Sequence, residues 1–526
     1  MVDFAVEKLP SDLTPKLVAG DNKSPAAAAS SVTSSPSATG LSNASSMLSA
    51  DSSKGPTPPT PMSLLEIDNA LDKLEKTSPR IESMSFGQSR FWFLRSYLED
   101  QIAFNVSATI ELRGSLDVSS LAKAVQTVAQ RHAALRTRFF TDENGQYLQE
   151  VLDGAPLQLE EKNISNPEDV AREFSSLKSH VYNLESGELM KILLLSQSRD
   201  VNYLLIGYHH INMDSMSLQI LLSDLDKVYR GLTLSPTVLQ YPDFAARQRQ
   251  ASYMDELKFW RDEYPNFPPV LPLLPFSRAT FRKPLRGYEH NRVDIKLDST
   301  LATRIKNVCL KSKVTPFHFY LSALKSLLFR FLDIDDVSIG MADANRNELN
   351  TLGSIGMYLN LLPLRFRRQS NQRFEESLKE AQSKVRVALA NSRLPFDLLI
   401  EQLDPPRSPS YSPIFQSFID YRPPMPPKKS FANCQIGTEE YDVGKNGYDI
   451  TIQVVDSADG RALIMLQVQS SLYSESDATV LMKSYRWLLE QFSAEPAMKM
   501  ESASLFSPRD VEDAIRLGAG QFVGSS

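Results

Sequence analysis

Two short apolar runs in the first half of the chain carry its clearest hydrophobic pattern. They are LMKILLLSQ (189–197) and VNYLLIGYHH (201–210), and three residues, Ser-Arg-Asp, separate them. Apolar runs of this length around a polar turn predict a hairpin of largely buried strands. Apolar residues then repeat at helical spacing across 218–229, which predicts a helix that Asp214 or Ser217 caps at its start.

The same patterns predict further elements on both sides of a proline-rich connector at 266–278. Helices are predicted at 63–74, 116–135, 301–313, 316–332, 374–390 and 478–492. Strands are predicted at 107–114, 135–140, 336–343, 359–366, 416–422, 449–456 and 461–469. Because both kinds of element occur in each half, the pattern predicts an α+β fold.

Composition divides the chain into four parts. From Ser24 to Pro61 the residues are mostly Ser, Ala, Thr and Pro, which cannot bury a core. Residues 1–62 are therefore predicted to be a disordered linker. The connector divides the rest into an N-terminal half at 63–265 and a C-terminal half at 266–495, and 496–526 is predicted to be a mostly polar tail.

Charge and cysteine content exclude several classes of function. The net charge of -6 and the isoelectric point near 5.7 argue against a nucleic-acid surface. Cys309 and Cys434 stand alone, so a disulfide framework or a cysteine zinc site is not expected. The N-terminus resembles no signal peptide and no apolar stretch of about 18 residues occurs, so we expect a cytoplasmic protein without a membrane span.

Two of the chain's six histidines stand side by side in YHHINMDS (208–215), where the predicted strand gives way to the predicted helix. Successive strand residues point to opposite faces, so His209 and His210 are not expected to face one cavity. We expect His209 to be structural and His210 to be available for chemistry. A neutral imidazole can accept a proton from a nucleophile or donate a hydrogen bond to a developing tetrahedral species.

Other interpretations of this stretch stay open on its residues alone. A histidine is more often structural than catalytic, and two histidines with a carboxylate can bind zinc. Because neighbouring strand residues diverge, we predict no metal site here. Asp214 either orients the histidine or pairs with an arginine that holds the loop, and Arg365 is the candidate arginine.

Together with its surroundings, the stretch resembles the His-His-x-x-x-Asp-Gly motif of condensation domains from nonribosomal peptide synthetases. Six more stretches resemble the other motifs of that family, in order: SMSFGQSRFWFL (83–94), RHAALRTRF (131–139), YPDFAARQR (241–249), SIGMYLNLLPLRF (354–366), NSRLPFDLLI (391–400) and RSPSYSPIFQSFIDYR (407–422). The sequence is most similar to those of condensation domains that are fused behind the acyl carrier protein of fungal highly reducing polyketide synthases. These include hybrid synthetases and lovastatin-type nonaketide synthases.

The resemblance implies two chloramphenicol-acetyltransferase-like subdomains in a V shape, with a central tunnel that two phosphopantetheine arms enter. No cofactor of its own is implied. The upstream acyl carrier protein would be one partner and a downstream peptidyl carrier the other. An acyl thioester on the donor carrier would be attacked by an aminoacyl thioester's amine, giving an amide, and His210 would deprotonate or position that amine.

The resemblance also assigns supporting roles. Asn360 is expected to face the tunnel, and Arg365 to form a buried pair with Asp214. His209 and Ser215 flank the catalytic residue within the motif. We expect His132, in the second motif, to brace a helix end rather than to act in catalysis.

Two departures from the family pattern open an alternative. Ser215 stands where the family has glycine, which adds a Cβ and a hydroxyl beside the reacting centre and predicts reduced activity. The stretch LFSPRDVEDAIRLGAGQ (505–521) resembles one that leads into an adenylation domain, yet none follows in this sequence. The alternative is a weak or repurposed domain that docks the acyl carrier protein and supports chain processing, release or assembly of the megasynthase. A plant-type acyltransferase that uses coenzyme A would need an Asp-Phe-Gly-Trp-Gly motif, which this sequence lacks.

Overall fold

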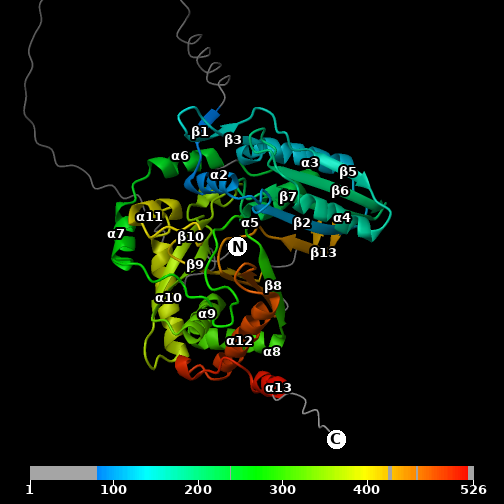
Figure 1. Ribbon diagram of the computed structural model, residues 1–526. Helices are drawn as coiled ribbons and strands as arrows, with labels where there is room; N and C mark the ends of the chain where they lie inside the picture. Colours follow the sequence, from blue (N-terminus) through cyan, green and yellow to red (C-terminus); the bar gives the residue numbers. More distant parts are fainter. Residues whose placement is uncertain (1–79, 237–238, 425–428, 458–459, 519–526) are drawn as a thin grey trace, which may run out of the picture. The chain divides into compact units, whose positions relative to one another are not determined.

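Two six-stranded sheets organise the residues that the structure describes (Figure 1). The structure is a computed structural model, and its described residues are 80–236, 239–424, 429–457 and 460–518. The predicted linker, the predicted helix at 63–74 and the end of the predicted tail lie outside these residues. Among the described residues, no helix combines the length and the apolar character that crossing a membrane requires.

The N-terminal sheet has the strand order β12-β13-β2-β7-β6-β5. Its strands are β2 (Asn105–Arg113), β5 (Leu159–Asn163), β6 (Met190–Ser198), β7 (Val201–His209), β12 (Ser430–Phe431) and β13 (Cys434–Asp442). The predicted hairpin is confirmed as the antiparallel pair β6 and β7. Leu205 packs with α4 (Pro167–Lys178), whereas Leu204 belongs to the main core with α3 (Val118–Arg131) and α5 (Ser215–Tyr229). Helices on both faces explain why the hairpin is apolar throughout.

The C-terminal sheet has the strand order β10-β9-β11-β14-β15-β8. Its strands are β8 (His290–Leu297), β9 (Asp336–Asp343), β10 (Asn360–Arg367), β11 (Ser417–Arg422), β14 (Ile450–Asp456) and β15 (Ala462–Gln469). The helices that pack with it are α8 (Ser299–Lys311), α9 (Pro316–Leu332), α10 (Phe374–Ala390) and α12 (Glu475–Ala494). Tyr421 contacts the rings of Phe317 and Tyr320, so this face of β11 is turned toward α9.

One segment does not follow the predicted division of the chain. Strands β12 and β13 lie within 266–495, the range predicted for the C-terminal half, yet β13 pairs with β2 and extends the N-terminal sheet. The sequence pattern did not predict β13, because most of its residues are exposed and lack the alternation that marks a half-buried strand. The two predicted halves of the chain are therefore joined by backbone hydrogen bonds as well as by side chains.

Shorter elements surround the sheets. They are a three-stranded sheet of β1 (Arg80–Ser83), β4 (Tyr147–Val151) and β3 (Thr137–Thr141), the helices α2 (Phe86–Tyr97), α6 (Tyr241–Gln250), α7 (Met254–Glu263), α11 (Phe396–Leu403) and α13 (Pro508–Gly518), and the 3-10 helices at Ala133–Arg136, Leu349–Thr351 and Met500–Ser502. The predicted α+β class is confirmed.

Candidate active site

The junction between β7 and α5 carries the double histidine. Strand β7 ends at His209 and helix α5 begins at Ser215. Of the two predicted caps, Asp214 is the one used, because its backbone is extended and its Oδ1 accepts a hydrogen bond from the Ser217 amide at 2.8 Å. The cap ends the turn that follows the strand and fixes where the helix starts.

His209 is a buried structural residue. Its Nδ1 accepts a hydrogen bond from the Ile211 amide at 3.1 Å, which holds the turn after the strand. The edges of Phe91 and Phe104 enclose its ring. Burial lowers the pKa of His209 to about 3, and the nearby His210 and Arg95 act in the same direction. His209 is therefore neutral at pH 7.

His210 lies in a different environment from its neighbour. Its ring is half-buried and stacks on Phe91 with 5.3 Å between the ring centroids. Burial lowers the pKa of His210, against the opposing effects of its own backbone and of the Asp214 carboxylate. Its Nδ1 is enclosed and has no hydrogen-bond partner among the described residues. The side chain is a neutral imidazole at pH 7.

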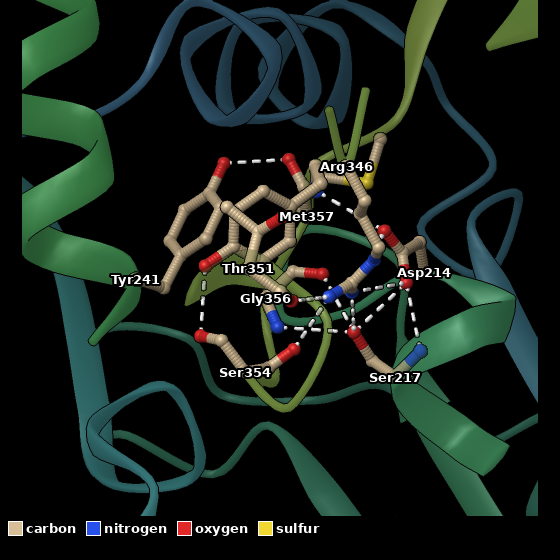
Figure 2. Close-up of polar contacts among 9 residues, drawn as sticks. Asp214, Ser217, Tyr241, Arg346, Thr351, Ser354, Gly356 and Met357 are labelled. Atoms are coloured by element: carbon tan, nitrogen blue, oxygen red, sulfur yellow. Dashed lines mark hydrogen bonds and ion pairs between the residues drawn. The ribbon is translucent and has the colours of Figure 1, made fainter. Parts of the chain in front are cut away.

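Asp214 is held by a buried arginine (Figure 2). The Nη2 group of Arg346 lies 3.0 Å from Oδ1 of Asp214, and the two side chains are 0% and 1% exposed. Oδ1 also accepts hydrogen bonds from the amide and hydroxyl of Ser217, and Oδ2 accepts one from the Tyr358 amide at 3.2 Å. Both carboxylate oxygens are thus satisfied, as a buried charge requires.

The same network joins the loop of the N-terminal sheet to residues 346–358, as Figure 2 shows. Arg346 donates from Nη1 to the carbonyls of Thr351 and Ser354 at 2.5 and 2.7 Å. The Ser217 Oγ lies 2.8 Å from the Gly356 carbonyl oxygen, with which Asp214 Oδ1 shares its one proton, and it accepts from the Gly356 amide at 3.0 Å. Tyr241 donates to the Met357 carbonyl at 2.6 Å. Segments from both halves therefore fix one another beside the histidines.

The predicted pair between Asp214 and Arg365 is wrong. Arg365 instead binds Asp336 at 2.5 Å and the Asn266 carbonyl at 2.6 Å. The reason is its place on β10, where it pairs with Ser338 near the far end of the strand from the loop that joins β9 to β10. Arg346 lies in that loop. Its sequence signal was a single arginine just after a predicted strand, which spacing alone does not connect to Asp214.

Asn360 supports the backbone. Its Nδ2 donates to the carbonyls of Ser392 and Leu394, both at 2.8 Å, and its Oδ1 accepts from the amides of Leu361 and Phe396, both at 2.9 Å. Three of these four contacts are with residues 392–396, immediately before and at the start of α11. The side chain is 5% exposed, so it is a support rather than a surface offered to a ligand.

The Asp214 contacts also bear on the zinc alternative. Its carboxylate is engaged by Arg346, Ser217 and Tyr358, and His209 uses Nδ1 within its own turn. Among the described residues no group of three His, Cys, Asp or Glu side chains lies in an arrangement that could hold a metal ion.

Comparison with known proteins places this geometry in a family. The family model described as "Condensation domain" matches residues 80–514. The chain belongs to the condensation-domain family. It is 44% identical over 454 residues to the hybrid PKS-NRPS synthetase poxE of Penicillium oxalicum and 43% identical over 452 residues to the polyketide synthase-nonribosomal peptide synthetase ffsA of Aspergillus flavipes. Each match covers 85% of this chain and 11% of the relative, so the chain spans about a ninth of their length.

A solved structure supports the same assignment. The condensation domain from the Monacolin K polyketide synthase MokA superposes with a TM-score of 0.75 at 26% identity, covering 81% of this chain and 100% of that one. The two six-stranded sheets agree with the predicted pair of acetyltransferase-like subdomains.

Other motif residues of this condensation domain brace its elements. Arg90 in α2 binds Asp397 in α11 at 3.0 Å, so the first and sixth motifs hold the two halves together. His132 lies at the end of α3, and its Nε2 is 3.0 Å from Asp224 Oδ2 in α5. These contacts agree with the bracing role expected of His132.

Ser215 departs from the family glycine without backbone strain. It is the first residue of α5, and it is not among the described residues with positive φ. A backbone angle that only glycine adopts is therefore not needed at this position. What Ser215 adds to the condensation domain is a half-buried Cβ and hydroxyl five residues after His210.

Proposed function

We propose that this condensation domain transfers a carrier-bound polyketide acyl chain to the amine of an aminoacyl thioester and so forms an amide. The observation that carries the proposal is His210, a neutral imidazole with its Nδ1 enclosed, beside a loop whose carboxylate is fully paired. A neutral imidazole can take a proton at pH 7, whereas an imidazolium cannot.

The reaction balances with one proton transfer through this residue. The amine nitrogen attacks the thioester carbonyl carbon, a carbon–nitrogen bond forms, and the carbonyl oxygen carries the developing negative charge. His210 accepts a proton from the attacking nitrogen or hydrogen-bonds the tetrahedral species. When the carbon–sulfur bond breaks, that proton leaves with the thiolate as the free carrier thiol.

Asp214 and Arg346 act as positioning residues in this proposal. Their buried pair holds the turn that carries His210, and the negative charge of Asp214 opposes the lowering of the pKa of His210. Neither residue has to touch the substrate. His209, Asn360 and Arg365 contribute only to the frame, through the contacts described above.

Carrier proteins are the partners that this function requires. The names of the relatives describe hybrid polyketide and peptide synthetases, whose chains are roughly nine times as long as the matched segment. We infer that the donor arrives on the phosphopantetheine arm of an upstream acyl carrier protein and the amine on that of a peptidyl carrier, through the tunnel expected of the family.

The test is transfer from a loaded carrier. The upstream acyl carrier protein is charged with an acyl chain, an aminoacyl carrier is added, and products are followed by intact-protein mass spectrometry with wild type and His210→Ala. Amide from the wild type and its loss in the variant support the proposal. Equal product from both proteins contradicts the role of His210. Carrier binding without any amide supports the alternative, a domain retained for docking, chain processing, release or assembly.

A further inference from the structure

Two groups of buried polar atoms without hydrogen-bond partners in the described structure bear on the proposed site. Four of them belong to residues 209–212, at the double histidine. The other place is the C-terminal sheet, where Nε and Nη2 of Arg422 and the side-chain oxygens of Gln453 and Gln467 have no hydrogen-bond partner among the described residues. Unpaired buried donors and acceptors are costly, so such groups indicate where a ligand's polar atoms are met.

The strand register places these sheet residues on one face. Asp420 lies opposite Gln453, and Thr451 lies opposite Gln467. Residues two apart in a strand share a face, so Arg422 shares the face of Asp420 and Gln453. Tyr421 points the other way, toward α9. Arg422 therefore lies on the polar face of the sheet, away from the helices.

Arg422 reaches the N-terminal sheet through Tyr441. The guanidinium lies over the Tyr441 ring at 5.2 Å from its centroid, and Tyr441 is part of β13, next to β2. Strand β2 pairs in turn with β7, where Val106 lies opposite Tyr208. Burial raises the pKa of Tyr208, and the charge of Arg422 acts against this effect. The arginine is thus electrostatically close to the residue two positions before His210.

The unpaired atoms of Arg422 have a specific geometry. Nε and Nη2 lie on the same edge of the guanidinium, which presents two parallel N–H groups to an acceptor. Asp420 lies 3.6 Å from Nε and compensates the positive charge without filling that edge. A second full negative charge would be repelled by Asp420, whereas a neutral carbonyl oxygen accepts the two hydrogen bonds without that penalty.

We propose that Arg422 binds a carbonyl oxygen of the carrier-bound substrate and positions it beside His210. The proposal rests on the proposed function and adds a residue that recognises the substrate. The oxygen belongs to one of three groups: a keto group in the acyl chain, the donor thioester or the acceptor thioester.

The test is binding of stable substrate mimics that cannot react. Three pantetheine amides serve as probes: octanoyl, 3-oxooctanoyl and glycyl. Each is titrated calorimetrically into wild type and Arg422→Gln. Arg422→Gln is expected to weaken binding by about tenfold or more for the probe whose oxygen the arginine meets. A loss confined to 3-oxooctanoyl identifies the chain keto group, a loss shared by both acyl probes identifies the donor thioester, and a loss confined to glycyl identifies the acceptor.

Controls separate this role from a general structural one. Arg292→Gln removes a guanidinium on β8 of the same sheet that is already paired with Asp294 at 2.7 Å, and it should leave all three affinities unchanged. If Arg422→Gln does not fold, Arg422→Lys keeps the charge but loses the two-pronged edge and should show the same selective loss. Unchanged affinities, or equal losses for all three probes, overturn the proposal. Because binding needs no turnover, a wild type that forms no amide would refute the proposed function and leave this result readable.

Discussion

The two ends of one short loop differ in how their polar groups are treated. At 214–217 the Asp214 carboxylate and the Ser217 hydroxyl are bound by Arg346, by backbone amides or by each other. At 208–212 one nitrogen of each histidine and both polar atoms of the Asn212 side-chain amide are buried and have no hydrogen-bond partner among the described residues. One residue, Met213, therefore separates a stretch whose side-chain polar groups are bound from one in which several are not.

This difference separates support from chemistry. A satisfied buried network fixes one conformation, because moving any member exposes an unpaired charge. Unsatisfied groups next to it lower stability and are kept in place by their rigid neighbour. We infer that 214–217 holds the loop so that 208–212 can meet a substrate. Substitutions at the two ends should therefore change different quantities.

The largest effect is expected on stability, from breaking the buried pair of Asp214 and Arg346. Arg346→Ala leaves Asp214 as a buried charge without its arginine, which should lower the free energy of unfolding by about 3–5 kcal/mol. Urea denaturation followed by circular dichroism measures this loss. A stability change below about 1 kcal/mol would show that the pair does not hold the loop.

A double-mutant cycle makes this prediction specific to Arg346. Asp214→Ala combined with Arg346→Ala should cost clearly less than the sum of the single losses, since both remove the same contact. Arg365→Ala is the matched control. Its ion pair is with Asp336, so its loss should add to that of Asp214→Ala.

The next largest effect is expected at His210, in the segment 208–212. His210→Ala should lower the rate of amide formation by about 10²- to 10⁴-fold, because it removes the proton acceptor. Its free energy of unfolding should change by less than about 1 kcal/mol, since the ring is half-buried and makes no hydrogen bond through Nδ1. Rates come from mass spectrometry of the carrier-bound products.

His132→Ala is the matched control for this substitution. His132 is a buried histidine that binds Asp224, so its removal should destabilise the fold and leave the rate per folded molecule nearly unchanged. A His210 variant that loses stability but keeps its rate would reverse the comparison between the two ends of the loop.

Hydrophobic pattern predicted the buried strands but neither the mostly exposed strands nor the electrostatic partners. The apolar runs at 189–197 and 201–210 specify β6 and β7 because buried strands need apolar side chains on both faces. Strand β13 was not predicted because a mostly exposed strand needs no such pattern. The choice of Arg346 over Arg365 depends on which end of β10 meets the loop, and that is set by sheet registry rather than by local sequence.

Strand alternation predicts different surroundings for the two histidines, but it does not predict which of their nitrogen atoms lack hydrogen-bond partners. Alternation alone predicts that His209 and His210 face different ways, and their different surroundings agree with it. Arg422, by contrast, stands at the end of a predicted strand, and nothing in the local sequence indicates that its guanidinium is enclosed. Its enclosed Nε and Nη2 arise from elements that pack around it from distant parts of the chain.

A smaller effect is expected from pH. The pKa of His209 is about 3 in the folded protein and near its ordinary value of 6.5 when unfolded. Between these values the unfolded state binds a proton that the folded state does not, so stability falls as pH falls, by at most about 1.4 kcal/mol per pH unit from this group. His209→Asn keeps an acceptor for the Ile211 amide and cannot titrate. Urea denaturation from pH 7 to pH 4 should give it a shallower slope than wild type, and equal slopes would contradict the assignment.

The smallest effect is expected at Ser215, the first residue of α5. Because Ser215 does not need a left-handed backbone, Ser215→Gly relieves no strain and should lower the free energy of unfolding by about 0.5–1 kcal/mol through backbone entropy. Removing the Cβ and hydroxyl should raise the rate a few-fold, equivalent to about 1 kcal/mol or less of activation free energy. Ser215→Ala separates the causes, since a rate like that of the glycine variant assigns the effect to the hydroxyl and a rate like wild type assigns it to the Cβ. A slower Ser215→Gly enzyme would mean that the serine contributes to the reaction, and Ser215 would then belong with the residues at 208–212.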